Sequence, residues 1–314
     1  MIENLVLEGG GVKVLAFCGA LEELNKRVPL NDIKRIAGSS GGAIVAGVIA
    51  CGYDPTELKE LMTNKDFKDF KDDSWGIIRD IWRLFKRYGI YKGELFYEWY
   101  GEQLEKKTGN ADITFKEVYE KYGKILVING ACLNRRQTHY YHHESNPNMP
   151  IRKAVLISMS IPLAFQAIKW QGDILVDGGT FENYPLGVFD IIGENGKVNL
   201  PNTRNGPALL GIKGGNKKTL GLKLITPAEQ VGGGMVYSGN DRIGNIVEFI
   251  TALINSFGSH IENLYIRPGY WERTVSINTG KIGTMQFVLS REEKDFLISE
   301  GRKGVEKFFS KNEN

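Results

Sequence analysis

The chain has 314 residues, of which 42% are hydrophobic and 25% are charged, enough apolar material for one large α/β domain or two modest ones. Its formal net charge of +3 is too small to indicate nucleic-acid binding, although it permits weak attraction to an anionic membrane. The three cysteines, Cys18, Cys51 and Cys132, are odd in number and widely spaced, which argues against a disulfide framework or a zinc site and favours a reducing compartment.

The start of the chain shows no signal peptide, because the strand-like stretch Leu5–Leu7 runs straight into a glycine-rich stretch. No apolar stretch reaches the length of about 20 residues that a membrane-spanning helix needs. We therefore expect a cytoplasmic protein without a transmembrane segment. A secretion route without a cleaved signal would leave the same pattern.

A glycine run, Gly9 to Gly11, separates a short apolar strand over residues 4–7 from helical spacing over residues 14–24. As a phosphate loop it lacks the Gly-Lys-Ser/Thr ending, and as a dinucleotide fingerprint it lacks the third glycine, where Val14 stands. Consecutive backbone N–H groups near a helix start suit an oxyanion hole. We favour that interpretation over a tight turn that needs glycine for its backbone angles alone.

A Gly-x-Ser-x-Gly pattern runs from Gly38 to Gly42, with Ser40 at its centre. The residues before it, 33–37, are typical of a buried strand, and those after it, 43–51, of a small-residue helix. A sharp strand-to-helix turn needs glycines on both sides and lifts the central hydroxyl towards the helix N-terminus. Ser40 is therefore the candidate nucleophile.

Strands and helices alternate through the first 51 residues, which predicts an α/β fold with three α/β/α layers and a mostly parallel central sheet. No linker marks a domain boundary, so we expect a single domain over residues 1–314. Within it we expect a catalytic core over about 5–190 and C-terminal strands and a helix over about 208–310.

Residues 65–91 form the most aromatic part of the chain, with aromatic and isoleucine residues at helical spacing and basic residues between them. Trp75, Trp82 and Phe85 illustrate the pattern. Such a segment can be a helical cap packed over the active site, or it can lie at a membrane surface with its apolar face among lipid chains. The two interpretations are compatible.

Residues 134–144 are polar and carry His139, His142 and His143 after a strand predicted over Lys124–Ile128. Adjacent histidines suggest a metal site, but the sequence places no carboxylate or cysteine cluster at ligand spacing. We therefore expect a solvated strand or loop and no bound metal.

Asp177-Gly178-Gly179 follows two short strands, predicted over 166–170 and 174–176, that come after a helix over 151–160. An acid at a strand end, with glycines that allow close backbone approach, is a candidate catalytic base. Asp-Gly is also a frequent turn dipeptide. Because the chain also contains the serine elbow, we favour the catalytic interpretation of Asp177 over the turn.

The second half of the chain predicts a strand over Thr219–Thr226, a helix over Ile243–Phe257, two further strands and a last helix that begins at Ser290. The two strands are expected over 262–267 and 274–278, and exposed or mobile loops over 195–205 and 229–241. The last helix is expected to end near Phe309.

Ser40 needs a base, and two arrangements are open. Ser40, Asp177 and His260 occur in the order of an α/β-hydrolase triad, but the elbow comes much earlier in the chain than that fold places it. In the alternative, Asp177 contacts Ser40 directly, and partial burial raises the pKa of the carboxyl group towards the working pH.

Three blocks, residues 9–13, 38–42 and 177–179, resemble in this order the signature blocks of the patatin-like phospholipase family. Residues 158–162 and 183–185 match as well, so the resemblance extends from about Leu5 to Pro185, with a weaker echo over 283–301. The ordered set is far more specific than any one block. The resemblance implies a patatin-like fold with Ser40 as nucleophile, Asp177 as base and Gly10 and Gly11 as oxyanion donors, without a histidine.

The sequence departs from the family at one position of the glycine block, where the basic residue is usually followed by glycine and Lys13 is here followed by Val14. We expect this change to affect the helix start more than catalysis. The residues that support the motifs are Lys13, Gly38, Gly42, Gly178 and Gly179.

The predicted function is a lipid acyl-ester hydrolase of the phospholipase A or lysophospholipase class, in which the Gly9–Gly11 loop holds the oxyanion. The expected partners are a phospholipid or another acyl-ester lipid and, transiently, a membrane surface; no cofactor or metal is needed. Two alternatives use the same residues or fold: an acyltransferase, and a lipid-binding protein without turnover. Nucleotide binding by the glycine loop is a remote option.

Overall fold

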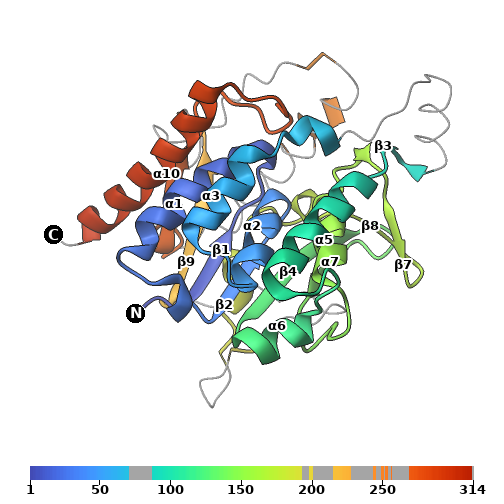
Figure 1. Cartoon of the computed structure of the whole chain (residues 1–314), viewed down its shortest axis with the longest axis horizontal. Coiled ribbons are helices and arrows are strands. Elements are labelled where there is room, and N and C mark those ends of the chain that lie inside the picture. Colours follow the sequence, from blue (N-terminus) through green and yellow to red (C-terminus); the bar gives the residue numbers. More distant parts are fainter. Residues whose placement is uncertain are drawn as a thin grey trace.

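The computed structural model describes residues 1–70, 87–192, 198–200, 215–227 and 269–312, together with isolated positions between 243 and 256. An eight-stranded sheet forms its centre, with strand order β10-β9-β1-β2-β4-β8-β7 and β5 paired to β4 (Figure 1). The strands are β1 (Asn4–Leu7), β2 (Arg35–Gly38), β4 (Ile125–Cys132), β5 (Gln137–Tyr141), β7 (Ile168–Trp170), β8 (Asp173–Asp177), β9 (Thr219–Ile225) and β10 (Thr274–Asn278). A separate pair joins β3 (Gly89–Tyr91) to β6 (Leu163–Phe165).

The sheet is parallel from β10 to β4 and antiparallel at β5, β8 and β7. The α/β class and the mostly parallel central sheet predicted from the sequence are thereby confirmed. Parallel strands need crossover helices between them, and the alternation in the first 51 residues supplies them.

The register of β4 explains how β8 reaches the centre of the sheet. Ile128 pairs with Gly38 of β2 and with Tyr141 of β5, so β2 and β5 lie on opposite edges of β4. Gly130 pairs with His139 of β5 and with Asp177 of β8. Strand β5 occupies one edge of β4 at both positions. On the other edge, β2 pairs with β4 as far as Ile128, and β8 pairs with β4 from Gly130 onwards. The end of β8 is thereby brought to the end of β2.

The described helices lie over one face of the sheet, some against its strands and others on neighbouring helices (Figure 1). They are α1 (Ala16–Asn25), α2 (Gly41–Ala50), α3 (Pro55–Asn64), α5 (Glu94–Thr108), α6 (Phe115–Tyr122), α7 (Ile151–Ser158) and α10 (Arg291–Asn312). Helices α1 and α10 approach each other at glycines: a Cβ on Gly19 would lie 1.9 Å from the carbonyl oxygen of Ile298. Small residues at a crossing let two backbones come close, so side chains there would push the helices apart.

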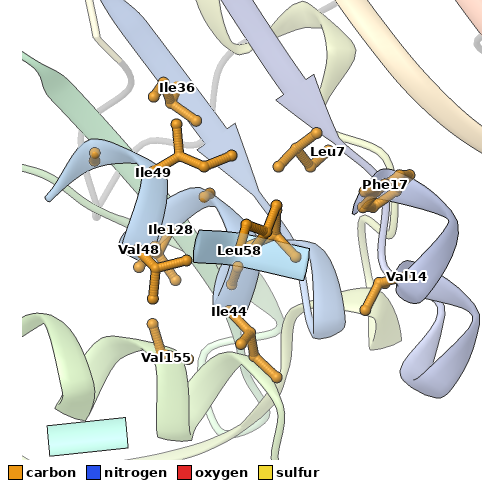
Figure 2. Close-up of a cluster of buried hydrophobic side chains, with 14 of the residues drawn as sticks. Leu7, Val14, Phe17, Ile36, Ile44, Val48, Ile49, Leu58, Ile128 and Val155 are labelled. Carbon is orange, nitrogen blue, oxygen red and sulfur yellow. The ribbon is translucent and has the colours of Figure 1, made fainter. Parts of the chain in front are cut away.

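Helix α2 is buried along its whole length, in agreement with its glycine, alanine, valine and isoleucine composition. Figure 2 shows Ile44, Val48 and Ile49 of α2 surrounded by side chains from its neighbours. These neighbours include Leu7 of β1, Ile36 of β2, Ile128 of β4, Leu58 of α3 and Val155 of α7. The helix that starts at the serine elbow is therefore held on all sides by the main core.

The opposite face of the sheet packs on a smaller cluster. Val6, Ala37 and Val127 point to this face from β1, β2 and β4. In the described part of the chain they are covered by residues 184–189, which include the 3-10 helix η5 (Leu186–Phe189), and by Tyr140. The same segment follows the Asp-Gly-Gly block, so its packing also anchors the loop after β8.

The structure corrects one local prediction and leaves another untested. Residues 134–144 are not solvated throughout, because β5 forms there and the side chains of His139 and His142 are 7% and 2% exposed. Within 65–91, the described residues form the 3-10 helix η3 (Phe67–Phe70) and strand β3, and residues 71–86 lie outside the described residues. The cap or membrane helix predicted there is therefore not tested.

Several predicted segments in the second half also fall largely outside the described residues: those over 195–205, 229–241, 243–257 and 262–267. The predicted strands over 219–226 and 274–278 and the last helix are confirmed as β9, β10 and α10. Among the described residues, no helix combines enough length with enough apolar character to cross a membrane.

Candidate functional site

Ser40 lies at the turn between β2 and α2, as the Gly-x-Ser-x-Gly pattern predicts. Its backbone has φ 50° and ψ −126°, a combination that a residue with a side chain rarely adopts. The flanking glycines make the turn sterically feasible. A Cβ on Gly38 would lie 2.4 Å from the carbonyl oxygen of Gly42, and one on Gly42 would lie 2.5 Å from that of Leu7.

Asp177 ends β8 and meets Ser40 directly. The Ser40 Oγ donates a hydrogen bond to Asp177 Oδ2 at 2.6 Å, and the backbone N–H of Gly179 donates to Oδ1 at 2.6 Å. The backbone N–H of Asp177 donates to the carbonyl oxygen of Ser160, which holds the strand end in place. The structure thus brings together two residues that are 137 positions apart in the sequence.

The carboxyl group of Asp177 is buried, and the two hydrogen-bond donors described above, the Ser40 hydroxyl and the Gly179 N–H, are both uncharged. Burial raises the pKa of Asp177 to about 7, and the hydrogen bonds from Ser40 and Gly179 lower it only in part. A carboxyl group with this pKa is ionised in a large fraction of molecules near neutral pH and still has useful affinity for a proton.

The glycine run lies against the serine elbow. A Cβ on Gly9 would lie 2.9 Å from the Cβ of Ser40, so only glycine permits this approach. The backbone N–H of Gly9 donates to the carbonyl oxygen of Asn183 at 3.0 Å. In the described part of the chain, nothing accepts a hydrogen bond from the N–H of Gly10 or Gly11. Of the three predicted oxyanion residues, Gly9 therefore fixes the loop, while Gly10 and Gly11 keep their donors available.

The other motif residues lie around the same centre. A Cβ on Gly178 would lie 2.4 Å from Asn129 Oδ1, so this position also needs glycine. Lys13 belongs to the 3-10 helix η1 (Gly11–Leu15), and its Cε lies 3.7 Å from the position of a Cβ on Gly10. Val14, the departure from the family pattern, is buried, and its side chain would be 2.8 Å from a Cβ on Gly41. Val14 thus packs against the start of α2.

Asn183 joins the loop after Asp177 to the glycine run through two hydrogen bonds. Its carbonyl oxygen accepts from the Gly9 N–H, and its side-chain Nδ2 donates to the Gly9 carbonyl oxygen at 3.0 Å. Residues 183–185 are part of the motif resemblance to the family, but the sequence alone indicates no role for them. The contact between two distant loops supplies that role.

Two further residues that sequence reasoning did not assign hold the elbow and the glycine run. Ser158 Oγ accepts a hydrogen bond from the Ser40 backbone N–H at 2.9 Å. Glu8, directly before the glycine run, pairs with Lys223 at 2.7 Å and accepts from the Leu224 N–H at 2.6 Å. Both members of this ion pair are buried. The sequence signals for this pair are weak: Lys223 is the charged residue of the otherwise mostly apolar strand β9, and Glu8 directly follows β1.

His260, the candidate third member of a triad, lies outside the described residues. The other three histidines are His139, His142 and His143, and in the described part of the chain none of them is hydrogen-bonded to Ser40 or Asp177. His139 instead lies beside Cys132 and Asp173, which the spacing argument against a metal site did not anticipate.

Comparison with known proteins agrees with these motifs. A family profile described as patatin-like phospholipase matches residues 5–190. Uncharacterized protein R571 of Acanthamoeba polyphaga mimivirus is 28% identical over 306 residues, which cover 97% of this chain and 92% of that protein. Probable lipid hydrolase 463L of Invertebrate iridescent virus 6 is 28% identical over 193 residues, which cover 59% of this chain and 62% of that protein.

The fold is also similar to that of a solved structure, VipD from Legionella pneumophila. The TM-score is 0.62 at 15% sequence identity, with 99% of this chain and 67% of that chain covered. At this level of identity the likeness concerns the fold alone. The family match, in contrast, spans the glycine run, the serine elbow and the Asp-Gly-Gly block, and it covers more than half of the chain. The chain therefore belongs to the patatin-like phospholipase family.

Proposed function

We propose that this protein is a lipid acyl-ester hydrolase of the phospholipase A or lysophospholipase class that works through a Ser40–Asp177 dyad. The observation that carries the proposal is the 2.6 Å hydrogen bond from Ser40 Oγ to Asp177 Oδ2. A serine hydroxyl becomes a nucleophile when an adjacent base takes its proton, and this bond puts the base in reach.

In the first half-reaction Ser40 Oγ attacks the ester carbonyl carbon while its proton passes to Asp177 Oδ2. The carbonyl oxygen gains the negative charge, and the N–H groups of Gly10 and Gly11 are the proposed donors to it. The N-terminus of α2, directly after Ser40, adds a favourable dipole. Cleavage of the C–O bond then releases the alcohol, which takes the proton from Asp177, and leaves an acyl group on Ser40.

In the second half-reaction Asp177 removes a proton from a water molecule as the water oxygen attacks the acyl-enzyme. The same donors stabilise the second oxyanion. Release of the fatty acid returns the proton to Ser40 Oγ. The chemistry is balanced with one base, so neither His260 nor a bound metal has a step to perform.

A lipid is the proposed substrate because the family is described as phospholipases and a viral relative is named a probable lipid hydrolase. The protein would meet such a substrate by transient contact with a membrane surface, which the small positive net charge favours. We propose a cytoplasmic protein that acts at membranes peripherally.

The test is release of fatty acid from phosphatidylcholine and lysophosphatidylcholine vesicles, followed by mass spectrometry of the products. Wild type should release fatty acid and become labelled by a fluorophosphonate, and Ser40→Ala should do neither. Ser310→Ala, which removes a hydroxyl on the last helix far from the site in sequence, is the matched control. His260→Ala should stay active if the dyad is correct; its inactivity in a folded protein would replace the dyad by a triad.

Binding to vesicles without labelling or product would contradict hydrolysis and favour the lipid-binding alternative. Transfer of the acyl group to added lysolipid or alcohol in place of water would favour the acyltransferase. Both outcomes are read from the same product analysis.

A further inference from the structure

Three potential metal ligands from three strands lie close together, at a position separate from the proposed dyad. The ligand atoms of Cys132, His139 and Asp173 all lie within 4.8 Å of one another. The residues come from the end of β4, the middle of β5 and the start of β8. Cys132 pairs with Leu175 and Gly130 pairs with both His139 and Asp177, so the alternation along each strand puts all three side chains on one face of the sheet.

We propose that Cys132, His139 and Asp173 form a zinc-binding site. A thiolate, an imidazole and a carboxylate together match the ligand preference of Zn²⁺, whereas Mg²⁺ and Ca²⁺ prefer oxygen ligands alone. In tetrahedral zinc sites ligand atoms are about 3.3–3.8 Å apart, so closing the cluster on an ion requires movements on the order of 1 Å. Binding forms a Zn–S bond and releases the Cys132 thiol proton to the buffer.

The burial of the three residues separates this cluster from an accidental surface grouping. Cys132 is fully buried, and His139 and Asp173 are 7% and 8% exposed. Cysteine, histidine and aspartate side chains at such depth normally have partners that account for their polar atoms. Here each side chain has a protein partner, and Cys132 Sγ donates to Asn134 Oδ1 at 3.2 Å. Zinc would replace this Cys132 bond, because the thiol loses its proton on binding, and would give all three side chains a common partner.

Neighbouring side chains hold the ligands as the outer shell of a metal site does. Arg135 Nε donates to Asp173 Oδ1 at 2.6 Å, and Asn134 Nδ2 lies 3.3 Å from the same oxygen, which leaves the second oxygen for an ion. The Gln137 amide lies 3.2 Å from His139 Nε2 and can fix the ring orientation. Such outer contacts orient ligands and raise metal affinity.

A cavity of about 450 Å³ gives access to the cluster. His139 and Asp173 line it together with Gln137, Tyr141, Glu144 and Trp170. With three ligands from the protein, a tetrahedral ion has one position left for water or for a small ligand that enters from this cavity. The site is therefore of the open type and can exchange metal with solvent.

The position of the cluster indicates what the ion does for the fold. Asp173 lies four residues before Asp177 on β8, about 13 Å along the strand. A zinc ion would tie β8 to β4 and β5 and so brace the strand that carries the proposed base. Because the dyad itself does not touch the cluster, zinc binding and ester hydrolysis can be tested separately.

The first experiment uses the wild-type full-length chain after removal of metal with a chelator. Titration with Co²⁺ should give a thiolate-to-cobalt charge-transfer band in the near ultraviolet that saturates at one ion per chain. Added Zn²⁺ should abolish this band and raise the unfolding midpoint by at least about 2 °C, since a ligand that binds only the folded state stabilises it. Absence of the charge-transfer band in wild type would overturn the proposal without any variant.

The second experiment measures zinc affinity against a chromophoric competitor in Cys132→Ala, His139→Ala and Asp173→Asn, each checked for folding by circular dichroism. Each substitution should weaken binding at least about tenfold, and Cys132→Ala should also remove the cobalt band. The matched controls are Cys18→Ala, another buried thiol, and His143→Ala, a neighbouring histidine. Equal affinity in ligand and control variants would overturn the site.

If Cys132→Ala does not fold, the isosteric Asp173→Asn and the wild-type cobalt spectrum decide the question. Fatty-acid release by the chelated wild type reports on the proposed function by itself. A negative result in that assay leaves the zinc titration unaffected, and the reverse also holds.

Discussion

Asp173 and Asp177 lie on one strand, on the same face, and both are almost fully buried, yet their electrostatic environments are opposite. Burial raises the pKa of Asp177 to about 7 because its partners are the neutral donors Ser40 and Gly179. Burial acts in the same direction on Asp173, but hydrogen bonds from Arg135 and Asn134 and the charge of Arg135 outweigh it, so its pKa is lowered.

Burial alone does not decide what a carboxylate can do. A buried carboxylate with only neutral donors retains affinity for a proton and suits a general base. A buried carboxylate beside a guanidinium stays ionised and suits an ion pair or a metal ligand. One strand supplies both because its two ends face different loops.

The largest expected effect comes from removing the proposed base, Asp177, at the end of β8 that has only neutral hydrogen-bond donors. Asp177→Asn keeps the shape of the side chain and can still accept from the Gly179 N–H, but it cannot take the Ser40 proton. The kcat for a soluble ester should fall by about 10²–10⁴-fold, the usual contribution of a general base. Asp295→Asn, at an exposed position on α10, should keep wild-type kcat. An active Asp177→Asn protein would remove Asp177 from the mechanism.

The second effect is on the pH dependence of the reaction. The proposed base must be ionised, so kcat/KM should rise about tenfold per pH unit well below pH 7 and level off above it. Because half of the carboxyl groups are ionised at the pKa, the rise from pH 5 to pH 7 should be about 50-fold. Initial rates with a soluble ester from pH 5 to 9 check this. A profile already flat at pH 5 would mean that Asp177 resembles Asp173, and the contrast between the two would be lost.

The third effect concerns stability and has the opposite sign to activity. An unfolded chain gives aspartate a pKa of about 4, so between about pH 4 and pH 7 the folded protein binds a proton at Asp177 that the unfolded chain does not. Wild-type stability therefore falls as the pH rises through this range. Relative to wild type, Asp177→Asn should gain about 3 kcal/mol between pH 5 and pH 8.

Urea unfolding of both proteins at the two pH values checks this gain, with Asp173→Asn in chelator as the comparison. Asp173→Asn removes the ion pair with the half-exposed Arg135, so it should be less stable than wild type by up to about 1 kcal/mol at both pH values, with no gain between them. A similar pH response in the two variants would show that their environments do not differ as described.

The smallest expected effect tests whether it matters that the groups around Ser40 and Asp177 are uncharged. Asn183→Ala removes one of the two bonds to Gly9 and should lower kcat about tenfold by loosening the glycine run. Asn183→Asp adds a negative charge beside Gly179, so it should also move the lower limb of the pH profile upward, which Asn183→Ala should not do. Identical pH profiles for the two variants would mean that this charge does not reach Asp177.

Much of the fold, and the residues of the proposed dyad, could be predicted because the signals are local. The glycine run, the Gly-x-Ser-x-Gly elbow and the Asp-Gly-Gly block each lie at a strand end that residue periodicity alone identifies. Residues 134–144 show the limit of such signals. Their polar composition predicts solvation, whereas Tyr140, Tyr141 and the two histidines His139 and His142 are buried because β5 pairs with β4.

From the sequence alone, the alternation of strands and helices in the first 51 residues, the strained turn at Ser40 and an acid at the end of a later strand could be predicted, whereas helices α5 and α6 were not. These features depend on backbone angles and on periodicities of a few residues. Tertiary structure alone decided that β8 continues along the edge that β2 leaves, which joins Ser40 to Asp177 and also brings Cys132, His139 and Asp173 together. Pairing between distant strands sets these contacts, and spacing along one chain does not encode which strand edges will meet.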